Sequence, residues 1–281
     1  MNKVTCIDVS YWNGDVDFKQ VKNAGINAVI IRAGYGRSAT QKDSMFEQNY
    51  KEAKAAGLKV GVYWYSYADS QNAATLEVKA CLEVLGDKKF DLPVYYDLEE
   101  SKVTSLGRKT LTTMAETFCE AIKKAGYKPG VYANLNWFKN YLDYTTLKSK
   151  YSIWLAQYYV TNGLECDIWQ NSSEGSIPGV NGNCDTNIVF NETIMGTSTA
   201  VKVENKTEEV CEVTLPVLKK GAESGYVKTL QILLNKYNDA KLLEDGKFGT
   251  ATYNAVVAYQ KSRKLTVDGV VGPNTWAYLL K

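Results

Sequence analysis

The chain has 281 residues, with 33 lysines and arginines against 31 aspartates and glutamates, a formal net charge of +2 and no histidine. This weak positive charge does not favour nucleic-acid binding, and no apolar run reaches the about 18 residues that a membrane-spanning helix requires. Without histidine, Ser-His-Asp and Cys-His nucleophiles, histidine-ligated zinc and histidine bases are excluded, so a hydrolase of this composition would work mainly with carboxylates.

We expect no secretory signal peptide, because Met1-Asn2-Lys3 leads directly into a predicted strand. We therefore expect synthesis in a cytoplasm, with release to any external target by another agent. The six cysteines include no C-x-x-C pair and are interpreted as free thiols. Cys6, Cys81 and Cys119 lie in apolar surroundings and are expected to be small core residues.

Segments rich in β-branched and aromatic residues, most of them bounded by glycine or proline, predict eight strands. They are residues 3–8, 27–33, 58–65, 93–99, 130–133, 152–156, 167–170 and 185–189. Between the first five, segments with helical spacing lead to Gly25, Gly57 and Gly126, the usual residue type just past a helix. This repeat predicts parallel strands with right-handed crossovers, and eight strands suggest a closed barrel.

The second half of this barrel is expected to be irregular. After the fifth strand the gaps are short and rich in Asn, Gly, Ser and Pro, as in residues 171–175. They leave room for hairpin-like connections but hardly for crossover helices. The predicted fold class is therefore α/β, an irregular (β/α) barrel of eight strands over residues 1–195, with few helices in its second half.

The fourth predicted strand ends in Asp97-Leu98-Glu99. Because side chains alternate along a strand, Asp97 and Glu99 should point the same way while Leu98 points into packing. Two adjacent carboxylates cannot ionise independently, and one protonated acid beside one ionised acid is what glycosidic cleavage needs. The alternatives are a solvated acidic strand end or a pair that binds a cation.

Two further carboxylates are predicted to reach the same mouth of the barrel. Functional groups gather at strand ends in such barrels, and Asp8 ends the first strand while Asp185 lies at the edge of the last. The first and last strands are neighbours in a closed barrel, so Asp8 and Asp185 should approach each other. Each could instead be a helix cap or a turn residue, but the convergence of four carboxylates favours a site.

Aromatic residues are expected at the same rim, where their faces suit sugar rings. The candidates are Tyr11, Trp12, Tyr35, Tyr63, Tyr65, Tyr132, Trp154 and Trp169. Such residues could instead fill the barrel, as we expect of one of Tyr95 and Tyr96. A binding cleft is the favoured interpretation.

Ordered motifs in this part of the chain resemble glycoside hydrolase family 25, the lysozymes of bacteria and of phage endolysins. They are residues 8–14 (DVSYWNG), 31–36 (IRAGYG), 61–67 (GVYWYSY), 97–99 (DLE), 168–170 (IWQ) and 182–187 (GNCDTN), and the resemblance covers about residues 2–192. It implies hydrolysis of the β-1,4 bond between N-acetylmuramic acid and N-acetylglucosamine in bacterial peptidoglycan. We expect no metal and no cofactor.

The resemblance also implies residue roles. Glu99 falls on the proton donor of the family's D-x-E motif, Asp97 is its ionised partner, which supports the transition state, and Asp8 and Asp185 complete the site. Retention assisted by the substrate's acetamido group is preferred, and inversion through an activated water is the alternative. The predicted substrate-binding residues are Tyr11, Arg32, Tyr63, Tyr65, Tyr132, Trp154 and Trp169.

The remainder of the chain is predicted to be a tether and a small domain. Residues 196–213 are polar and without clear periodicity, which is typical of a linker, with Cys211 in it or just beyond. Residues 214–281 contain three helical stripes and two D-G-x-(F/V)-G turns, at 245–249 and 268–272, which predict a three-helix binding module. It resembles the peptidoglycan-binding domain type 1 family through Gly221, residues 227–231, both turns and Thr275-Trp276, which implies attachment to the cell wall.

The sequence thus predicts a bacteriolytic, endolysin-like lysozyme (an N-acetylmuramidase) whose partner is peptidoglycan, with no nucleic acid and no membrane insertion. Alternatives are a glycosidase for another N-acetylhexosamine polymer such as chitin, or a wall-binding protein with a catalytically silent barrel. The missing histidine disfavours an amidase or endopeptidase. Without a signal peptide, we expect a phage or prophage enzyme released through a holin, with a bacterial autolysin as the alternative. The sequence does not predict the oligomeric state.

Overall fold

The computed structural model describes residues 4–158, 163–196, 198–199 and 215–279, and its contacts divide the chain into two units, Met1–Val203 and Glu204–Lys281. Most of the predicted linker at 196–213, including Cys211, lies outside the described residues. Two residues from its first part, Ser198–Thr199, form a short strand (β10) that pairs with β4 (Lys89–Phe90).

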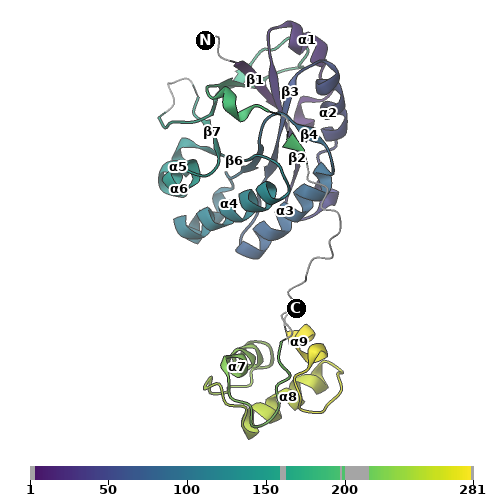
Figure 1. Cartoon of the computed structure of the whole chain (residues 1–281), viewed down its shortest axis with the longest axis vertical. Helices are drawn as coiled ribbons and strands as arrows, with labels where there is room; N and C mark the ends of the chain where they lie inside the picture. Colours follow the sequence, from purple (N-terminus) through teal and green to yellow (C-terminus); the bar gives the residue numbers. More distant parts are fainter. Residues whose placement is uncertain (1–3, 159–162, 197, 200–214, 280–281) are drawn as a thin grey trace. The chain divides into compact units, whose positions relative to one another are not determined.

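In the described part of the first unit, eight strands close into a barrel (Figure 1). In order around the barrel they are Val4–Val9 (β1), Ala28–Tyr35 (β2), Lys59–Tyr65 (β3), Val94–Asp97 (β5), Pro129–Asn134 (β6), Ser152–Ala156 (β7), Ile168–Gly175 (β8) and Cys184–Val189 (β9). Successive barrel strands from β1 to β6 are parallel, as the sequence predicts. The pairs β6–β7 and β7–β8 are parallel too, although the short gaps after the fifth predicted strand had suggested hairpin-like connections. The last strand, β9, is antiparallel to both of its neighbours, β8 and β1.

Helices cover the first half of the barrel far more than the second. The three predicted helices are confirmed as Phe18–Asn23 (α1), Phe46–Ala55 (α2) and Gly107–Lys124 (α4). A fourth, Gln71–Leu85 (α3), lies beside α4 and was not among the predicted helices (Figure 1). Much of its buried face is alanine, so the apolar contrast that predicts a helix is weak there.

The described residues of the second half contain only short helices, which confirms the predicted irregularity. They are α5 (Leu135–Asn140) and α6 (Tyr144–Lys148), both between β6 and β7. Short 3-10 helices occur at Tyr11–Asn13, Ala39–Gln41, Ser101–Leu106 and Glu192–Ile194. None of the described helices is both long and apolar enough to cross a bilayer.

The fully buried pair Tyr95 and Tyr96 shows how the barrel separates two cores. Tyr95 points inward and packs edge-on against Trp154, with ring centroids 5.3 Å apart. Gly130 on the next strand makes room for it, because a Cβ atom there would lie 2.3 Å from the Tyr95 ring. Tyr96 points outward and stacks on Phe118 of α4 at 4.1 Å. One of the two therefore fills the barrel, as predicted.

Four of the cysteines described in the structure are buried free thiols, as expected from the sequence. They are Cys6, Cys81, Cys119 and Cys184. Burial raises the pKa of Cys6, Cys81 and Cys119 well above the usual value, so these thiols are unreactive.

The second unit contains the three predicted helices, Gly225–Asn238 (α7), Thr250–Ser262 (α8) and Pro273–Leu279 (α9), around a core of its own. Its two predicted turns are built alike. Nε2 of Gln231 donates to Asp245 Oδ1 at 2.9 Å, and its Oε1 accepts from the amide of Gly246 at 2.9 Å. Gln260 makes the corresponding bonds to Asp268 and Gly269. Both glycines have positive φ, 74° and 68°, as the predicted turn requires.

Candidate active site

The four predicted carboxylates lie around one mouth of the barrel. Asp8 is the second-last residue of β1, Asp97 is the last residue of β5, and Glu99 follows two residues later. Asp185 is the second residue of β9 and lies directly opposite Asp8 in the strand register. Because β9 runs antiparallel, its beginning reaches the mouth at which the parallel strands end. The predicted approach of Asp8 and Asp185 is therefore confirmed. The hairpin-like connections predicted for the second half agree with a reversed strand, but the sequence did not identify which strand it is.

A buried network of side chains orients Asp8. Its Oδ2 accepts hydrogen bonds from Gln170 Nε2 at 3.0 Å and from Asn187 Nδ2 at 2.7 Å. Asn187 Oδ1 in turn accepts from the indole N–H of Trp154 at 2.7 Å, and Gln170 Oε1 accepts from the hydroxyl of Tyr132 at 2.9 Å. Since the indole can only donate, the amide of Asn187 must turn its nitrogen towards Asp8. The barrel interior thus fixes both donors.

Burial and the neighbouring charge set the protonation of Asp8 and Asp185. Burial, reinforced by the charge of Asp185, raises the pKa of Asp8 to about 8, although the two amide donors act against it. Burial raises the pKa of Asp185 to about 6. Near neutral pH the two facing groups therefore carry one proton and one negative charge between them.

Asp97 and Glu99 differ in depth. Asp97 is 3 % exposed, and among the described residues its Oδ1 has no hydrogen-bond partner. Burial, followed by the charge of Glu99, raises the pKa of Asp97 well above its ordinary value. Burial, then the charges of Asp185 and Glu100, also raises the pKa of Glu99.

These shifts bear on the predicted protonation states. The raised pKa of Glu99 agrees with the prediction that it keeps its proton, whereas the raised pKa of Asp97 acts against the prediction that Asp97 is ionised. The reason is that Asp97 still belongs to the strand, whereas Glu99 has left the sheet and reaches the mouth. Leu98 between them is buried, in agreement with the predicted alternation.

Glu99 lines a cavity of about 330 Å³ at the ends of β6 and β7. The other residues around it are Tyr132, Asn134, Leu135, Asn136, Ala156, Gln157 and Tyr158. Tyr132 is thus placed beside the carboxylates, as predicted, whereas Tyr158 and the amides were missed. Among the described residues of this lining, Glu99 is the only one with an ionisable carboxyl group, so the cavity suits a neutral, hydrogen-bonding ligand such as a sugar.

A second cavity, of about 470 Å³, lies at the ends of β1, β2 and β3. Its lining consists of Tyr11, Trp12, Arg32, Tyr35, Lys42, Asp43, Ser44, Tyr65 and Tyr67. Arg32 is fixed there by Nε, which lies 2.7 Å from Asp43 Oδ2, and its guanidinium lies 4.9 Å from the centre of the Tyr11 ring. The predicted residues Tyr11, Arg32 and Tyr65 are brought together here. Asp43 was missed because no local pattern marks its contact with a strand.

Trp154 does not lie on the rim, contrary to prediction. It is 1 % exposed, and its ring packs inside the barrel against Tyr63, Tyr95 and Tyr132. Its ring packs in the barrel interior beneath the mouth, and its indole N–H orients Asn187. Tyr63 lies inside the mouth, where burial and the charge of Asp8 raise its pKa well above the usual value.

Trp169 is also absent from the rim. Its neighbours Ile168 and Gln170 point into the barrel, so Trp169 points to the outer face. There its ring stacks on Phe190, and its indole N–H donates to the carbonyl of Gln157 at 2.8 Å. The sequence motif placed this residue near the strand end but did not reveal which face it occupies.

Another cavity, of about 700 Å³, lies beside α1 and α2. Its charged lining residues are Asp15, Asp17, Lys19 and Glu52, and it includes none of the four predicted carboxylates. Within the described residues no group of three or more aspartates, glutamates, cysteines or histidines is arranged to hold a metal ion.

Comparison with known proteins assigns both units. Residues 7–180 match the model of the glycosyl hydrolases family 25, and residues 223–279 match a putative peptidoglycan binding domain. The autolytic lysozyme of Clostridium acetobutylicum is 29 % identical over 272 residues, which is 96 % of this chain and 76 % of that protein. Lysozyme M1 of Streptomyces globisporus is 26 % identical over 64 % of this chain and 66 % of its own length.

Solved structures agree with these matches. The CTP1L endolysin superimposes with a TM-score of 0.61 and 26 % identity, covering 68 % of this chain and 68 % of that one. The catalytic domain of the endolysin ply40, from a bacteriophage of Listeria monocytogenes, has a TM-score of 0.56 and 25 % identity over 68 % of this chain and 95 % of its own.

The raised pKa of Asp97 predicts a pH-dependent gain in stability for Asp97→Asn. Between the unfolded pKa, about 3.9, and the higher folded value, the folded protein binds more protons than the unfolded chain, so its stability falls as pH rises. Asparagine cannot ionise and escapes this loss. We expect the barrel's Tm to rise by at least about 2–4 °C at pH 7.5, the effect of ~1 kcal/mol in a domain of this size, and to change little at pH 4.

Asp91→Asn is the control of opposite sign. Burial raises the pKa of Asp91. The hydrogen bond from Lys54 and the positive charge of Lys54 act in the opposite direction, and the net shift of the pKa is downward. Its stabilisation is present above the unfolded pKa and is lost as pH falls, so this variant should lower the Tm at pH 7.5. Equal Tm changes for Asp97→Asn at both pH values would contradict our assignment of a buried, protonated Asp97.

Proposed function

Because the chain belongs to the glycosyl hydrolases of family 25, we propose that the mouth of its barrel hydrolyses the β-1,4 bond between N-acetylmuramic acid and N-acetylglucosamine in bacterial peptidoglycan, with Glu99 as the proton donor. The lysozymes and endolysins among its relatives support the lysozyme function. The observation that carries the assignment of Glu99 is its position. It lines a cavity, and burial and neighbouring charges raise its pKa, as a general acid requires.

The other carboxylates would then act around Glu99. Burial is the largest cause of the raised pKa of Asp97 and the charge of Glu99 is the second, so a protonated Glu99 makes Asp97 easier to ionise. Its Oδ1, unpartnered among the described residues, would accept the N–H of the substrate's 2-acetamido group. An ionised Asp185 near neutral pH would stabilise the positive charge that develops on the sugar ring, with Asp8 as its protonated neighbour.

We also propose a division of work between the units. Residues 1–195 would cleave the glycan, and residues 214–281, which resemble a peptidoglycan binding domain, would hold the protein on the wall. Each unit has a hydrophobic core of its own, so the two functions need not share residues. A tethered wall-binding module raises the local concentration of substrate for the barrel.

Glu99→Gln should abolish lysis of purified walls while the fold is retained. Glutamine preserves the shape of the side chain but has no proton to donate, so activity should fall by roughly a hundredfold or more. Turbidity loss and new reducing ends at muramic acid would be measured, with circular dichroism as the check on folding. A folded Glu99→Gln variant with near-normal activity would remove Glu99 from the acid role, and products from chitin but not from peptidoglycan would favour the alternative substrate.

Glu100→Gln should move the alkaline limb of the pH profile to lower pH. The charge of Glu100 helps to raise the pKa of Glu99, so its removal lets Glu99 lose the catalytic proton at a lower pH. The profile of kcat/KM on soluble wall fragments measures this. Glu83→Gln, an exposed substitution on α3, is the control and should leave the profile unchanged. An unaltered limb in Glu100→Gln would show that another group controls it.

A protein that ends at residue 195 should keep its activity on soluble wall fragments but bind intact walls poorly. Sedimentation with purified walls measures the bound fraction, and reducing-sugar release from soluble fragments measures catalysis. Use of the Glu99→Gln variant in the sedimentation assay prevents digestion of the walls during the experiment. If whole protein and truncated protein sediment equally, the second unit does not attach this enzyme to walls.

A further inference from the structure

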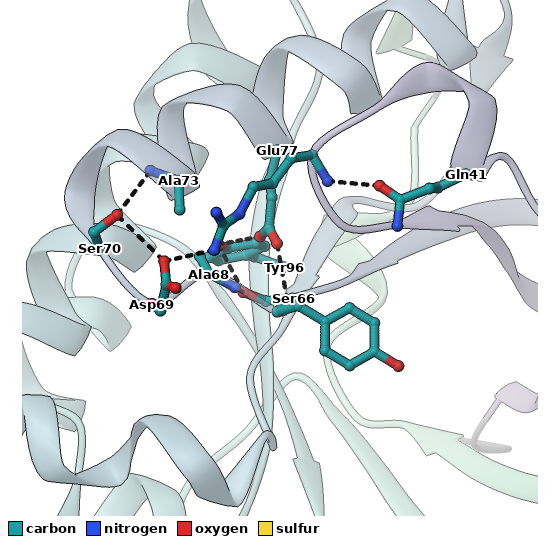
Figure 2. A network of polar contacts seen from close by, with 10 residues as sticks. Gln41, Ser66, Ala68, Asp69, Ser70, Ala73, Glu77 and Tyr96 are labelled. Carbon is teal, nitrogen blue, oxygen red and sulfur yellow. Dashed lines mark hydrogen bonds and ion pairs between the residues drawn. The ribbon is translucent and has the colours of Figure 1, made fainter.

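Glu77 on α3 is a buried carboxylate that the proposed reaction does not use. It is 0 % exposed and accepts hydrogen bonds from the segment after β3 and from β5. Its Oε1 accepts the backbone N–H of Tyr67 at 2.8 Å, and its Oε2 accepts the hydroxyl of Tyr96 at 2.6 Å. The Ser66 hydroxyl donates to Tyr96 Oη at 2.8 Å and accepts the N–H of Ala68 at 3.2 Å. Figure 2 shows this network beside the segment that leaves β3.

The network holds the segment that carries Tyr67. Tyr67 is 48 % exposed and lines the cavity of about 470 Å³. Its ring packs against Tyr65, at 4.9 Å between centroids, and edge-on against Tyr35 at 6.0 Å. A half-exposed side chain depends partly on its own backbone for its position, and Glu77 binds the N–H of that same residue.

A second tether to this segment lies on the surface. Arg37 Nη2 lies 2.5 Å from Asp69 Oδ1, but their side chains are 45 % and 62 % exposed, and exposed ion pairs contribute little. Gln41, labelled in Figure 2, accepts the backbone N–H of Arg37 at 2.9 Å. The buried bonds to Glu77 are therefore the stronger restraint on the segment.

Glu77 also links the segment that carries Tyr67 to β5, the strand that ends at Asp97. It does so without contacting the reacting carboxyl groups. Tyr96 immediately precedes Asp97 in β5, and the N–H of Ser66 donates to the carbonyl of Asp97 at 3.0 Å. Burial is the largest influence on the pKa of Glu77 and raises it, against the hydrogen bonds from Tyr96 and Tyr67. An apolar residue at this position would avoid the cost of burying the carboxyl group, but it would leave the Tyr67 N–H without its acceptor.

We propose that Glu77 is a positioning residue for glycan binding: through the Tyr67 N–H it holds the Tyr67 ring as a wall of the cavity that contains Arg32. This inference rests on the proposed function, since it assigns that cavity to the glycan strand on one side of the cleaved bond. Glu77 then determines affinity for a polymeric substrate and leaves the proton transfer unaffected.

The test compares variants of the whole chain on soluble, polymeric peptidoglycan. Glu77→Leu should raise KM about three- to tenfold, the effect expected when one net hydrogen-bond contribution is lost, with kcat within about twofold of wild type. Glu77→Gln should restore a near-normal KM, because its amide oxygen still accepts the Tyr67 N–H. Tyr96→Phe breaks the other bond to Glu77, so it should lower the Tm while leaving KM unchanged.

A double-mutant cycle identifies the residue through which Glu77 acts. Tyr67→Ala alone should raise KM by a similar factor, and adding Glu77→Leu to it should cause no further increase. A normal KM in Tyr67→Ala overturns the proposal, and this holds even if Glu77→Leu fails to fold. Equal increases in KM for Glu77→Leu and Tyr96→Phe would assign Glu77 to stability alone. Failure of the wild type to cleave the substrate would instead refute the proposed function.

Discussion

The two amide donors on Asp8 are the interaction on which the mouth depends. Gln170 comes from β8, Asn187 from β9 and Asp8 from β1, so the contact lies where the parallel part of the barrel meets its antiparallel strand. A barrel of parallel strands alone would place the start of its last strand at the opposite end. The reversal of β9 brings Asp185 to the mouth, and the amides hold Asp8 opposite it. The strand contacts that close the barrel therefore also bring the carboxyl groups of the site together.

That assembly places more carboxyl groups together than can ionise at once. Burial is the first cause of the raised pKa of Asp8, Asp97, Glu99 and Asp185, and mutual repulsion adds to it for three of them. The arrangement costs stability, because each ionised group loses hydration that few hydrogen bonds replace. The same cost keeps a proton available near neutral pH in a chain without histidine. A site that was better satisfied would be more stable and a poorer acid.

The sequence was sufficient for the order of the strands and for the four carboxylates, because both follow from local patterns. Strand periodicity and helix-ending glycines mark the barrel, and closure predicts that Asp8 and Asp185 are neighbours. Side-chain facing was harder. Trp154 and Trp169 were both predicted at the rim, yet Trp154 points into the barrel and Trp169 points to its outer surface. A tryptophan is compatible with either environment, so the residue type alone does not predict its facing. The roles of Asp43 and Glu77 could not be predicted for another reason. Their partners, Arg32 and Tyr96, are 11 and 19 residues away in the sequence, with no repeating spacing to indicate the contact.

Buried amide side chains perform one task in both units, and composition gives no sign of it. An amide has both a donor and an acceptor group, so it can take a hydrogen bond on one side and give one on the other. Asn187 accepts from Trp154 and donates to Asp8; Gln231 accepts from Gly246 and donates to Asp245. A carboxylate could only accept and a hydroxyl is too short to reach both partners. In the barrel the amide orients a reacting group, whereas in the smaller unit it closes a turn. The two amides make the same kind of hydrogen bonds, and the residue that each one binds determines its role.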